Sequence, residues 1–401
     1  MRVALLTDES LPMGTRVHAK MIHELAVEFQ RNGHKCVVIT PGDPKQKSKL
    51  VIDYLDGVEI WRFRSGYIRG YGMVRRVFNE WLLSFRAWRA IAKEVERCGF
   101  DLCINYTPSI FFGPLARRLK VRGTYVYLIL RDMFPQWLID QGIISKRSPA
   151  RIFLEYYEKL NYRMSDCIGV MSEANMRVFR EAHPSYANVK ILMNWSSTSS
   201  SFLDNETSNI RRDYDLSEKV VFFYGGNLGH SNDMHNIMRL ARNLIDHTDA
   251  HFLIIGQGDY FDWIKEVVVL WELRNVTVLP SVPQDEFKKI LKEVDVGLFS
   301  LSKKHTAHNF PGKLLGYMVE SIPILGSTNH GNDLLDLVNS AGAGYIHVNG
   351  NDDALAVSAV KLLKNKTVRL DCGTNSRALL MKRFSVESAF AKITSELDVV
   401  D

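Results

Sequence analysis

The sequence predicts an α/β protein of two domains, each built on a parallel sheet with helices on both faces. Two observations predict this class. Short apolar runs with strand character alternate with helical stretches in both halves of the chain, which is the pattern of a doubly wound sheet. A polar tract rich in Ser and Thr, at 194–209, interrupts the alternation midway and is typical of an interdomain linker. The length of 401 residues suits two or three domains.

The first half supplies one sheet. A buried strand at Arg2–Thr7 is followed by a helix at Val17–Asn32, which Gly33 ends at the C-cap position. Helical stretches separate most of the later strands. Those strands are expected at Lys35–Thr40, Val58–Phe63, Leu102–Tyr106, Tyr125–Leu130, Asp166–Met171 and Val189–Leu192.

The second half repeats the alternation. Its strands are expected at Val220–Tyr224, His251–Ile255, Val276–Leu279, Val296–Ser300, Pro323–Leu325 and Gly344–Val348. Its helices include Met234–Ile245, Asp262–Leu273, Gln284–Val294 and Gly312–Val319. Open sheets of this kind bind ligands at the carboxyl ends of their strands, so we expect the site in the cleft between two such domains.

The composition excludes several classes of protein. Apolar residues make up 46% and charged residues 24% of the chain, which is ordinary for a globular protein and argues against disorder or a collagen-like fibre. No apolar run approaches 18 residues, so we expect no ordinary transmembrane helix. The N-terminus turns acidic after four apolar residues, which is unlike a signal peptide. Five cysteines without a C-x-x-C pair favour a reducing cytoplasm over disulfides or zinc.

The net charge of +6 conceals two unlike halves. Residues 1–200 hold 30 Lys and Arg against 19 Asp and Glu, a net charge of +11; the remainder hold 21 against 26, a net charge of −5. A basic first half indicates an anionic partner, which is nucleic acid, an anionic membrane or a phosphorylated ligand.

Glycine-containing loops follow several strands. Gly14 and Arg16 lie between the first strand and its helix, where free N–H groups and a guanidinium suit an anion, although a plain turn is the alternative. In the second half Gly225–Gly229 and Gly256–Gly258 follow neighbouring strands. Repeated glycine loops at one edge favour a nucleotide site over packing turns.

A lysine opens a helix in the second half. Pro311-Gly312-Lys313 precedes an apolar helix, and a cation at that end opposes the helix dipole. The placement makes sense if an anion such as a diphosphate lies between the lysine and the N-terminus of the helix. His305 and His308 are spaced as a metal pair, but no third ligand accompanies them, so we expect no metal. Asp213-Tyr214-Asp215 matches D-x-D in a polar segment, and we interpret it as solvated.

Candidate acceptor residues gather in the first half. Arg131-Asp132 directly follows a strand, and a carboxylate there is placed for acceptor binding or proton handling. A buried structural ion pair is the alternative. His18, in the first turn of the first helix, is expected at the same edge, and Asn105 ends another strand.

Residues 61–97 concentrate basic and aromatic side chains. The apolar members of one helical face are most simply core packing: Phe78, Trp81, Leu82, Phe85 and Ala92. A basic, aromatic edge beside them suits an anionic bilayer surface, with nucleic acid as the rival partner. The residues that we assign to the membrane are Tyr67, Arg69, Tyr71, Arg75, Arg76 and Arg86. No RNA-binding signature is present, so nucleic acid is not expected.

Taken together, these residues resemble a bacterial glycosyltransferase of the GT-B fold, in the large retaining group (glycosyltransferase family 4 type) that uses nucleotide-diphosphate sugars. The resemblance covers nearly the whole chain. Its motifs are His23–Ala26, Asn32–Thr40, Asn194-Trp195, Tyr224–Gly229, Ile254–Gly258, Asn275–Pro280, Asp295–Ser300, Pro311–Lys313 and Phe384-Ser385. The Asn-Trp junction, the Gly-Asn-Leu-Gly turn and the Pro-x-Lys element resemble an O-antigen and capsule subgroup that includes N-acetyl-L-fucosaminyl transferases.

The resemblance implies two Rossmann-like domains with parallel sheets facing across a cleft. Residues 1–193, joined by a C-terminal helix at 385–401 that packs back on them, would form the acceptor and membrane side. Residues 194–384 would bind the nucleotide-sugar. The group carries Glu-x7-Glu around the helix that follows Pro311, but in this chain His308 and Gly316 stand at those two places. The positions at which the group usually has an Arg and a Lys to bind the donor phosphates fall near Asn227 and Asn232.

The activity implied is retaining transfer of a sugar to a polyprenyl-diphosphate-linked saccharide in surface polysaccharide synthesis, without a metal or other cofactor. We assign catalytic roles to Asp132, Lys313 and His308. The donor set is Gly14, Arg16, Gly226, Asn227, Gly256, Gly258, Val282 and Lys313, and the acceptor set is His18, Asn105, Arg131 and Asp132. The expected location is the cytoplasmic face of the inner membrane. The alternatives are a sugar-nucleotide epimerase using His308 with Asp132, and a non-catalytic nucleotide-sugar-binding scaffold.

Overall fold

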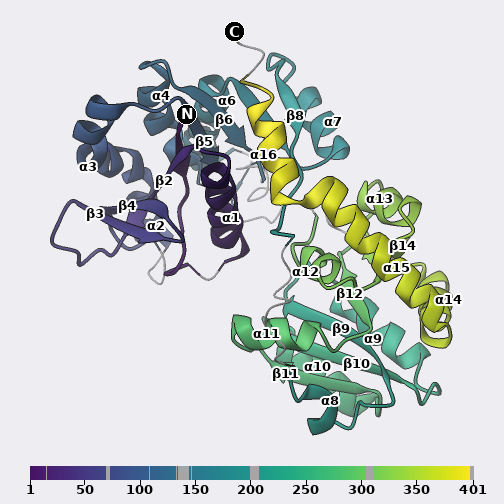
Figure 1. The fold of residues 1–401 in the computed structure, drawn as a ribbon. Coiled ribbons are helices and arrows are strands. Elements are labelled where there is room, and N and C mark those ends of the chain that lie inside the picture. Colours follow the sequence, from purple (N-terminus) through teal and green to yellow (C-terminus); the bar gives the residue numbers. More distant parts are fainter. Residues whose placement is uncertain are drawn as a thin grey trace. The chain divides into compact units, whose positions relative to one another are not determined.

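The computed structural model of the chain divides into two units (Figure 1). Unit 1 comprises Met1–Asn194 with Val386–Asp401, and unit 2 comprises Trp195–Ser385. The structure describes residues 1–14, 16–68, 73–107, 109–131, 133, 144–145, 147–198, 207–303 and 310–397, without the side chains of residues 73 and 74. Each unit is considered by itself below.

Unit 1 is built on an eight-stranded sheet in the order β3-β4-β2-β1-β5-β6-β7-β8. All neighbouring strands are parallel except β3 and β4. The strands are β1 (Arg2–Leu6), β2 (Lys35–Gly42), β3 (Leu50–Leu55), β4 (Val58–Arg64), β5 (Leu102–Tyr106), β6 (Tyr125–Ile129), β7 (Cys167–Val170) and β8 (Val189–Ile191). The helices are α1 (Val17–Arg31), α2 (Met73–Trp81), α3 (Leu83–Cys98), the 3₁₀ turn η1 (Ile110–Phe112), α4 (Gly113–Lys120), α6 (Pro149–Met164), α7 (Glu173–Ala182) and α16 (Val386–Thr394).

The order of this sheet defines its ligand-binding edge. Successive strands from β1 run outward through β2 to β4, whereas β5 returns to the other side of β1. The carboxyl ends of β1 and β5 therefore flank a topological switch point, where open α/β sheets bind ligands.

The C-terminal helix α16 belongs to unit 1. Its Phe390 contacts Phe29 of α1 edge to face, with ring centroids 4.9 Å apart, and stacks on His34 at 5.8 Å. Phe29 is fully buried. This packing confirms the expected return of the final helix onto the first domain.

Unit 2 carries a six-stranded parallel sheet in the order β11-β10-β9-β12-β13-β14. The strands are β9 (Val220–Asn227), β10 (Ala250–Gln257), β11 (Val276–Pro280), β12 (Val296–Ser300), β13 (Ile324–Thr328) and β14 (Gly344–Val348). The helices are α8 (Ile210–Asp213), α9 (Met234–Asn243), α10 (Phe261–Leu270), α11 (Gln284–Leu291), α12 (Lys313–Val319), α13 (Leu334–Ser340), α14 (Asp352–Lys364) and α15 (Lys366–Leu379), followed by a π-helical turn, Leu380–Phe384. Its switch point lies between β9 and β12.

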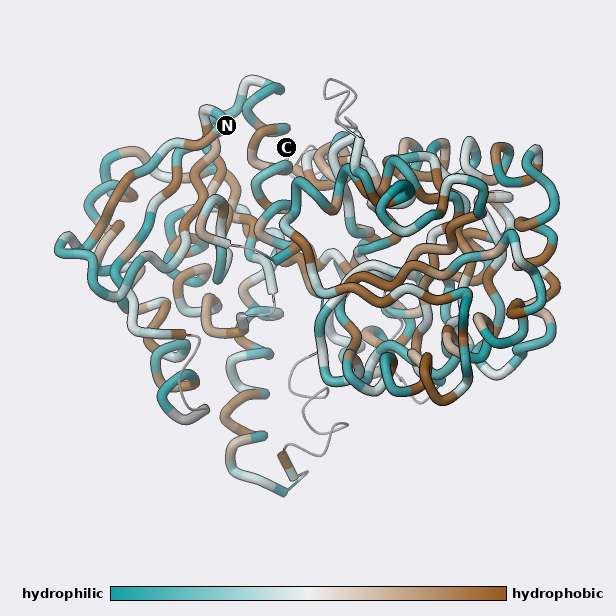
Figure 2. The backbone as a smooth tube through the Cα atoms, turned by 90° about the horizontal axis from the view of Figure 1, so that it is seen from below, coloured by the Kyte–Doolittle hydropathy of each residue, from teal (hydrophilic) through white to brown (hydrophobic). Residues whose placement is uncertain are grey.

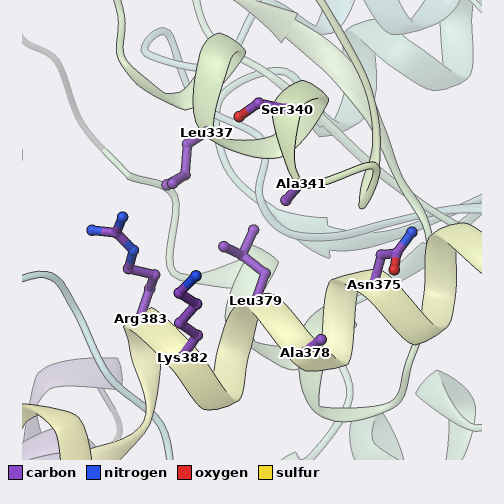
Figure 3. Close-up of a pocket in the computed structure, with 8 residues that line it drawn as sticks. All are labelled: Leu337, Ser340, Ala341, Asn375, Ala378, Leu379, Lys382 and Arg383. Atoms are coloured by element: carbon purple, nitrogen blue, oxygen red, sulfur yellow. The ribbon is translucent and has the colours of Figure 1, made fainter.

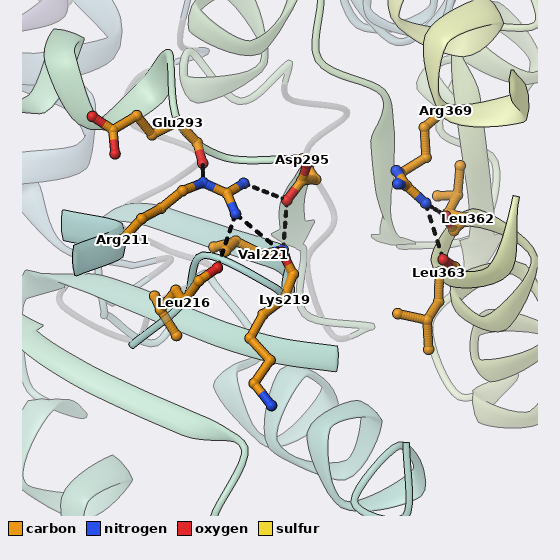
Figure 4. Close-up of polar contacts among 9 residues, drawn as sticks. All are labelled: Arg211, Leu216, Lys219, Val221, Glu293, Asp295, Leu362, Leu363 and Arg369. Atoms are coloured by element: carbon orange, nitrogen blue, oxygen red, sulfur yellow. Dashed lines mark hydrogen bonds and ion pairs between the residues drawn. The ribbon is translucent and has the colours of Figure 1, made fainter. Parts of the chain in front are cut away.

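Arg211 fixes the amino ends of β9 and β12 (Figure 4). Its guanidinium donates to the Glu293 carbonyl oxygen at 2.7 Å and to the Asp295 carboxylate at 2.7 Å. It also donates to the carbonyl oxygens of Leu216 and Lys219, each at 3.0 Å. The same Asp295 oxygen accepts from the Val221 amide of β9 at 2.8 Å. This network holds the two central strands at the edge opposite to their carboxyl ends.

Hydrophobic residues concentrate in the strands of both sheets, whereas the helices alternate polar and apolar faces (Figure 2). In unit 2, Phe222 and Phe252 stack across β9 and β10 with ring centroids 5.1 Å apart, inside a fully buried cluster. Burial on both faces is what a parallel sheet with helical layers requires. Among the described helices, none combines the length and the apolar character needed to cross a bilayer.

Candidate functional site

The strands β9 and β12 separate at the switch point of unit 2. They pair only at Phe222–Phe223 with Val296–Gly297, near their amino ends. The Tyr317 hydroxyl of α12 lies farther along and donates to the carbonyl oxygens of Phe223 and Leu298, at 3.2 and 3.0 Å. A side chain from the helix thus enters between the diverging strands, and it anchors α12 against the middle of β9 and of β12.

Lys313 begins α12 on the same helical face as Tyr317, four residues earlier. Its Nζ lies 3.3 Å from the centroid of the Tyr224 ring. A Cβ built on Gly226 would come within 4.0 Å of that Nζ. The amine therefore lies beside the exposed end of β9, at Gly226 and Asn227.

The Lys313 amine is enclosed, although the residue as a whole is only half buried. Nζ is buried and has no hydrogen-bond acceptor within the described part of the chain. Burial lowers the pKa of this lysine well below its ordinary value. The face of the Tyr224 ring attracts a cation and opposes part of that shift. A buried ammonium without an anion is costly, so the position is suited to receive one.

Two of the predicted donor glycines have packing reasons of their own. A Cβ on Gly256 would lie 1.9 Å from the Gly226 carbonyl oxygen, and one on Gly258 would lie 2.7 Å from the Leu228 carbonyl oxygen. Gly258 also has a φ of 143°, which L side chains rarely adopt. Close approach of the loops after β9 and β10 accounts for both residues, so their roles toward a donor remain predictions.

The rim beside Gly226 is held by short polar contacts. The Asn227 carbonyl oxygen accepts from the Tyr224 hydroxyl at 2.9 Å and from Asn232 Nδ2 at 3.1 Å. The loops after β9 and β10 are joined by a bond from the Leu228 amide to the Gln257 carbonyl oxygen at 2.9 Å. Val282 is half buried just after β11. These loops form a fixed edge on which a ligand can rest.

The switch point of unit 1 carries an acid and imidazole cluster. His18 Nε2 lies 3.1 Å from Asp8 Oδ1 and 3.9 Å from Glu9 Oε2. The His18 ring stacks on Tyr106 with centroids 5.7 Å apart. His18 was predicted at this edge, whereas Asp8 and Glu9 were overlooked. Two acids that directly follow the first strand were the signal that could have found them.

The loop that holds Gly14 and Arg16 differs from a simple anion site. A Cβ on buried Gly14 would lie 2.4 Å from Glu9 Cγ, so packing explains this glycine. Arg16 Nε lies 3.9 Å from Glu9 Oε2, with half of the Arg16 side chain exposed. Arg62 anchors the loop by donating to Ser10 Oγ at 3.1 Å and to the Leu11 carbonyl oxygen at 2.7 Å. Nearby carboxylates oppose a phosphate here, and sugar hydroxyls suit the loop better.

Two predicted acceptor residues form structural contacts. Arg131 is buried and donates to the carbonyl oxygens of Leu192 and Met193, at 2.5 and 3.3 Å. Asn105 is 1% exposed and donates to Asn161 Oδ1 at 2.7 Å. These contacts tie β5 and β6 to their neighbours.

Four predicted site residues lie outside the described residues: Asp132, His308, Arg69 and Tyr71. His305 lies outside them as well. Within the part of the chain that the structure describes, no group of three or more His, Cys, Asp or Glu side chains could hold a metal ion.

The core-packing interpretation of the 78–92 face was wrong for its large aromatic residues. Phe78, Trp81 and Phe85 are 55%, 40% and 51% exposed. These residues lie on α2 and α3. They are exposed because the core of unit 1 covers other residues, such as Leu83 and Ala87 of α3. The Trp81 indole N–H donates to the Tyr157 hydroxyl at 2.6 Å.

The exposed aromatic surface continues onto α6. Ile152, Phe153 and Tyr156 are 71%, 39% and 58% exposed, and the rings of Phe153 and Tyr156 both contact Tyr157. We define the aromatic surface as Phe78, Trp81, Phe85, Ile152, Phe153 and Tyr156. Of the predicted membrane residues, Arg75 and Arg76 are exposed, Arg75 lies over the Tyr67 ring at 5.9 Å, and Arg86 is half buried and bonded to Asn79.

A pocket of about 290 Å³ lies in unit 2 between α13 and α15 (Figure 3). It is lined by Leu337, Ser340, Ala341, Asn375, Ala378, Leu379, Lys382 and Arg383. Ser340 is the last residue of α13, and Ala341 follows it just before β14 begins. The pocket is therefore on the amino-end side of the sheet, away from the switch point.

Two family models match the chain in succession. The model described as Glycosyltransferase Family 4 covers residues 18–194, and the model described as Glycosyl transferases group 1 covers residues 206–379.

Curated relatives are distant. WbjE of Pseudomonas aeruginosa, named a probable glycosyltransferase, is 23% identical over 54% of this chain and 54% of its own. WcaI of Escherichia coli strain K12, named for glycosyl transfer in colanic acid biosynthesis, is 24% identical over 53% of this chain and 54% of its own. The chain thus matches about half the length of these relatives.

Solved structures show the same fold. Sucrose-phosphate synthase from Thermosynechococcus elongatus has a TM-score of 0.71 at 12% identity, covering 100% of this chain and 98% of that one. HepE of Anabaena, in complex with UDP and glucose, has a TM-score of 0.68 at 14% identity, with both chains fully covered. WaaG, involved in lipopolysaccharide biosynthesis, has a TM-score of 0.65 at 12% identity over 98% of this chain and 99% of its own. Two parallel α/β sheets of the GT-B type are the fold that these structures share with the chain.

Proposed function

The chain belongs to the glycosyltransferases by both of its halves, and from this premise we propose that it transfers a sugar from a nucleotide-diphosphate sugar to a polyprenyl-diphosphate-linked saccharide, with retention of the anomeric configuration. The pathway proposed is surface polysaccharide synthesis, of O-antigen or capsule. The names of WcaI and WaaG, which refer to colanic acid and lipopolysaccharide biosynthesis, support this class of product. The observation that carries the proposal is the enclosed Lys313 amine beside Gly226.

The donor is proposed to bind at the switch point of unit 2. Its diphosphate would lie against the exposed Gly226 and Asn227 backbone and accept from Lys313. Its base would rest on the loops after β10 and β11, which include Gly258 and Val282. The complex of HepE with UDP supports a UDP-sugar as the first donor to test.

Stabilising the leaving diphosphate is the main catalytic task in this proposal. The bond between the anomeric carbon and the phosphate oxygen breaks while the bond to the acceptor oxygen forms on the same face. The acceptor proton passes to the departing phosphate oxygen, so no carboxylate pair is required. Asp132 is proposed to orient the acceptor hydroxyl and His308 to contact the donor sugar. A fixed cation in a dry site serves such charge development well.

The acceptor is proposed to bind at unit 1. Asp8 and Glu9 accept hydrogen bonds from hydroxyl groups, and His18 beside them can donate or accept. A sugar of the acceptor fits this chemistry better than its diphosphate does. The lipid portion calls for a membrane surface, and the aromatic surface with Arg75 and Arg76 is proposed to lie on anionic lipid.

The test is a transfer assay with radiolabelled nucleotide-sugars and a lipid-linked saccharide extract. Wild type is expected to label the lipid fraction with one donor, and Lys313→Met is expected to abolish most of the labelling. Lys288→Met, at an exposed lysine of α11, is the matched control and should retain activity. Donor turnover without any lipid acceptor would favour an epimerase instead. Equal labelling by Lys313→Met would refute the site.

A further inference from the structure

The buried lysine of the donor site has an unusual environment for a phosphate-binding residue. Its Nζ is enclosed and lies against the face of Tyr224 at 3.3 Å, with no acceptor in the described part of the chain. A lysine that only awaits an anion in water would normally extend into solvent with its charge hydrated. Here the amine is enclosed by the protein before any anion arrives.

We propose that Lys313 is kept as a neutral amine in the free protein and takes up a proton from solvent when an anionic diphosphate binds beside Gly226. This inference rests on the proposed function, because the diphosphate is that of the nucleotide-sugar. The Nζ lone pair accepts one proton from solvent, and the new ammonium pairs with a phosphate oxygen. Binding of the donor is therefore coupled to proton uptake.

The groups around the amine are compatible with this proposal. Tyr224 from β9 and Tyr317 from α12 are the titratable side chains that the described contacts place nearest the amine. Arg377 of α15, which also packs on α12, donates to the Val319 carbonyl oxygen at the other end of that helix. Burial raises the pKa of both phenols, so neither supplies a negative charge at neutral pH. Lys313 forms no ion pair within the described residues, and burial is what lowers its pKa. His305 and His308 precede the helix but lie outside the described residues.

The coupling makes the site prefer anionic ligands over neutral ones. A neutral ligand of similar shape provides no anion, so the amine stays unprotonated and adds little to its binding. A diphosphate supplies the charge that makes protonation favourable, because an opposite charge nearby favours the ionised form. Nucleosides and free sugars are then discriminated against, and the diphosphate is released more readily as the pH rises.

The experiment measures protons taken up on binding. UDP and inorganic pyrophosphate are titrated calorimetrically into the full-length protein at about pH 8, where a lysine of ordinary pKa is already charged. Buffers of different ionisation enthalpy are compared, since the heat then changes in proportion to the protons exchanged. The expected result is an uptake approaching one proton per ligand bound. The affinity should fall by up to tenfold per unit of pH in this region, as linkage requires.

Two variants make the result specific to the lysine. Lys313→Arg carries a permanent charge, so it should lose the proton uptake of the lysine, and any uptake that remains belongs to the ligand's own phosphate. Lys313→Met has no amine to protonate, so it should lose the same uptake. This variant should stay folded because it only removes a buried polar group. Wild-type binding whose heat is independent of the buffer would overturn the inference while leaving the proposed donor site intact. Failure of wild type to bind any nucleoside diphosphate or pyrophosphate would overturn both.

Discussion

Replacing Lys313 by Met should make the protein more stable and less active at once. The amine is fully enclosed without a hydrogen-bond acceptor among the described residues, and removing such a group relieves about 1–3 kcal/mol of desolvation cost. The contact with Tyr224 at 3.3 Å would offset up to about 2 kcal/mol of this only in the charged form, whereas the amine is proposed to be neutral in the free protein. The net gain in unfolding free energy at neutral pH is therefore about 1–3 kcal/mol. The pKa of Lys313 is lowered, so the folded state binds fewer protons than the unfolded state, and the gain should shrink as the pH rises.

The loss of activity in the same variant has a larger scale. A charged donor to the leaving group contributes about 2–4 kcal/mol to the transition state, which corresponds to a rate lower by about 30- to 1000-fold. Urea denaturation at several pH values and the transfer assay measure the two effects on one preparation. Lys288→Met should change neither. A Lys313→Met variant that is less stable than wild type, or that turns over normally, would refute the reasoning.

Three further changes follow from the described contacts. Burial raises the pKa of Glu158 to about 7, against the bond from Tyr162 that lowers it; the folded state therefore binds the extra proton between pH 4.5 and about 7, and stability is lost as the pH rises through that window. Glu158→Gln should abolish this loss, worth about 3 kcal/mol from the size of the shift, in urea titrations at successive pH values; an unchanged pH profile would count against it. Arg211→Met should lower the unfolding free energy by about 2–4 kcal/mol, because it removes the bonds that join β9 and β12, and a thermal midpoint equal to that of wild type would contradict this. Changing Phe78 and Phe85 together to Ser should leave the thermal midpoint within a degree or so yet weaken sedimentation with anionic vesicles at least about tenfold, since each exposed ring contributes more than 1 kcal/mol on burial in lipid; undiminished vesicle binding would reject the aromatic surface.

The alternation of strands and helices was enough to predict the class of fold. Strands buried on both faces, such as β5 and β12, are mainly apolar runs, and their predicted bounds agree with the structure. The antiparallel strand β3 was missed because it is an edge strand with exposed side chains and no alternation to mark it. Asp56-Gly57, both at positive φ, form the two-residue turn to β4, and that dipeptide is a hairpin signal that could have found the strand.

The candidate site was only partly predictable. Lys313 was identified from a local conflict between a cation and a helix N-terminus, which is visible in sequence. The pairing of His18 with Asp8 and with Tyr106 joins residues that are 10 and 88 positions apart in the chain, so the sheet order had to be known first. Arg131 was predicted to bind the sugar acceptor because the sequence shows its position after a strand. The sequence does not show the two carbonyl oxygens that accept hydrogen bonds from its guanidinium.

The exposed rings of α2 and α3 show a different limit. A helical wheel identifies an apolar face, but it does not say whether protein or another phase covers that face. On α3, exposed Phe85 lies two residues from buried Leu83 and Ala87 and therefore on the opposite side of the helix, and only the packing shows which side the protein covers. An exposed group of aromatic residues is itself informative, because globular surfaces seldom carry one without a partner.

The most direct test of the account is a thermal-shift panel of nucleotide-sugars on wild type and Lys313→Met. Binding at 100 times Kd stabilises the folded state by about 2.7 kcal/mol, so one nucleotide-diphosphate sugar should raise the wild-type midpoint clearly above the others. The same ligand should produce little or no shift in Lys313→Met, although the free variant melts at least as high as wild type. An equal shift in both proteins, or no shift with any nucleotide-sugar, would contradict a donor site built on Lys313.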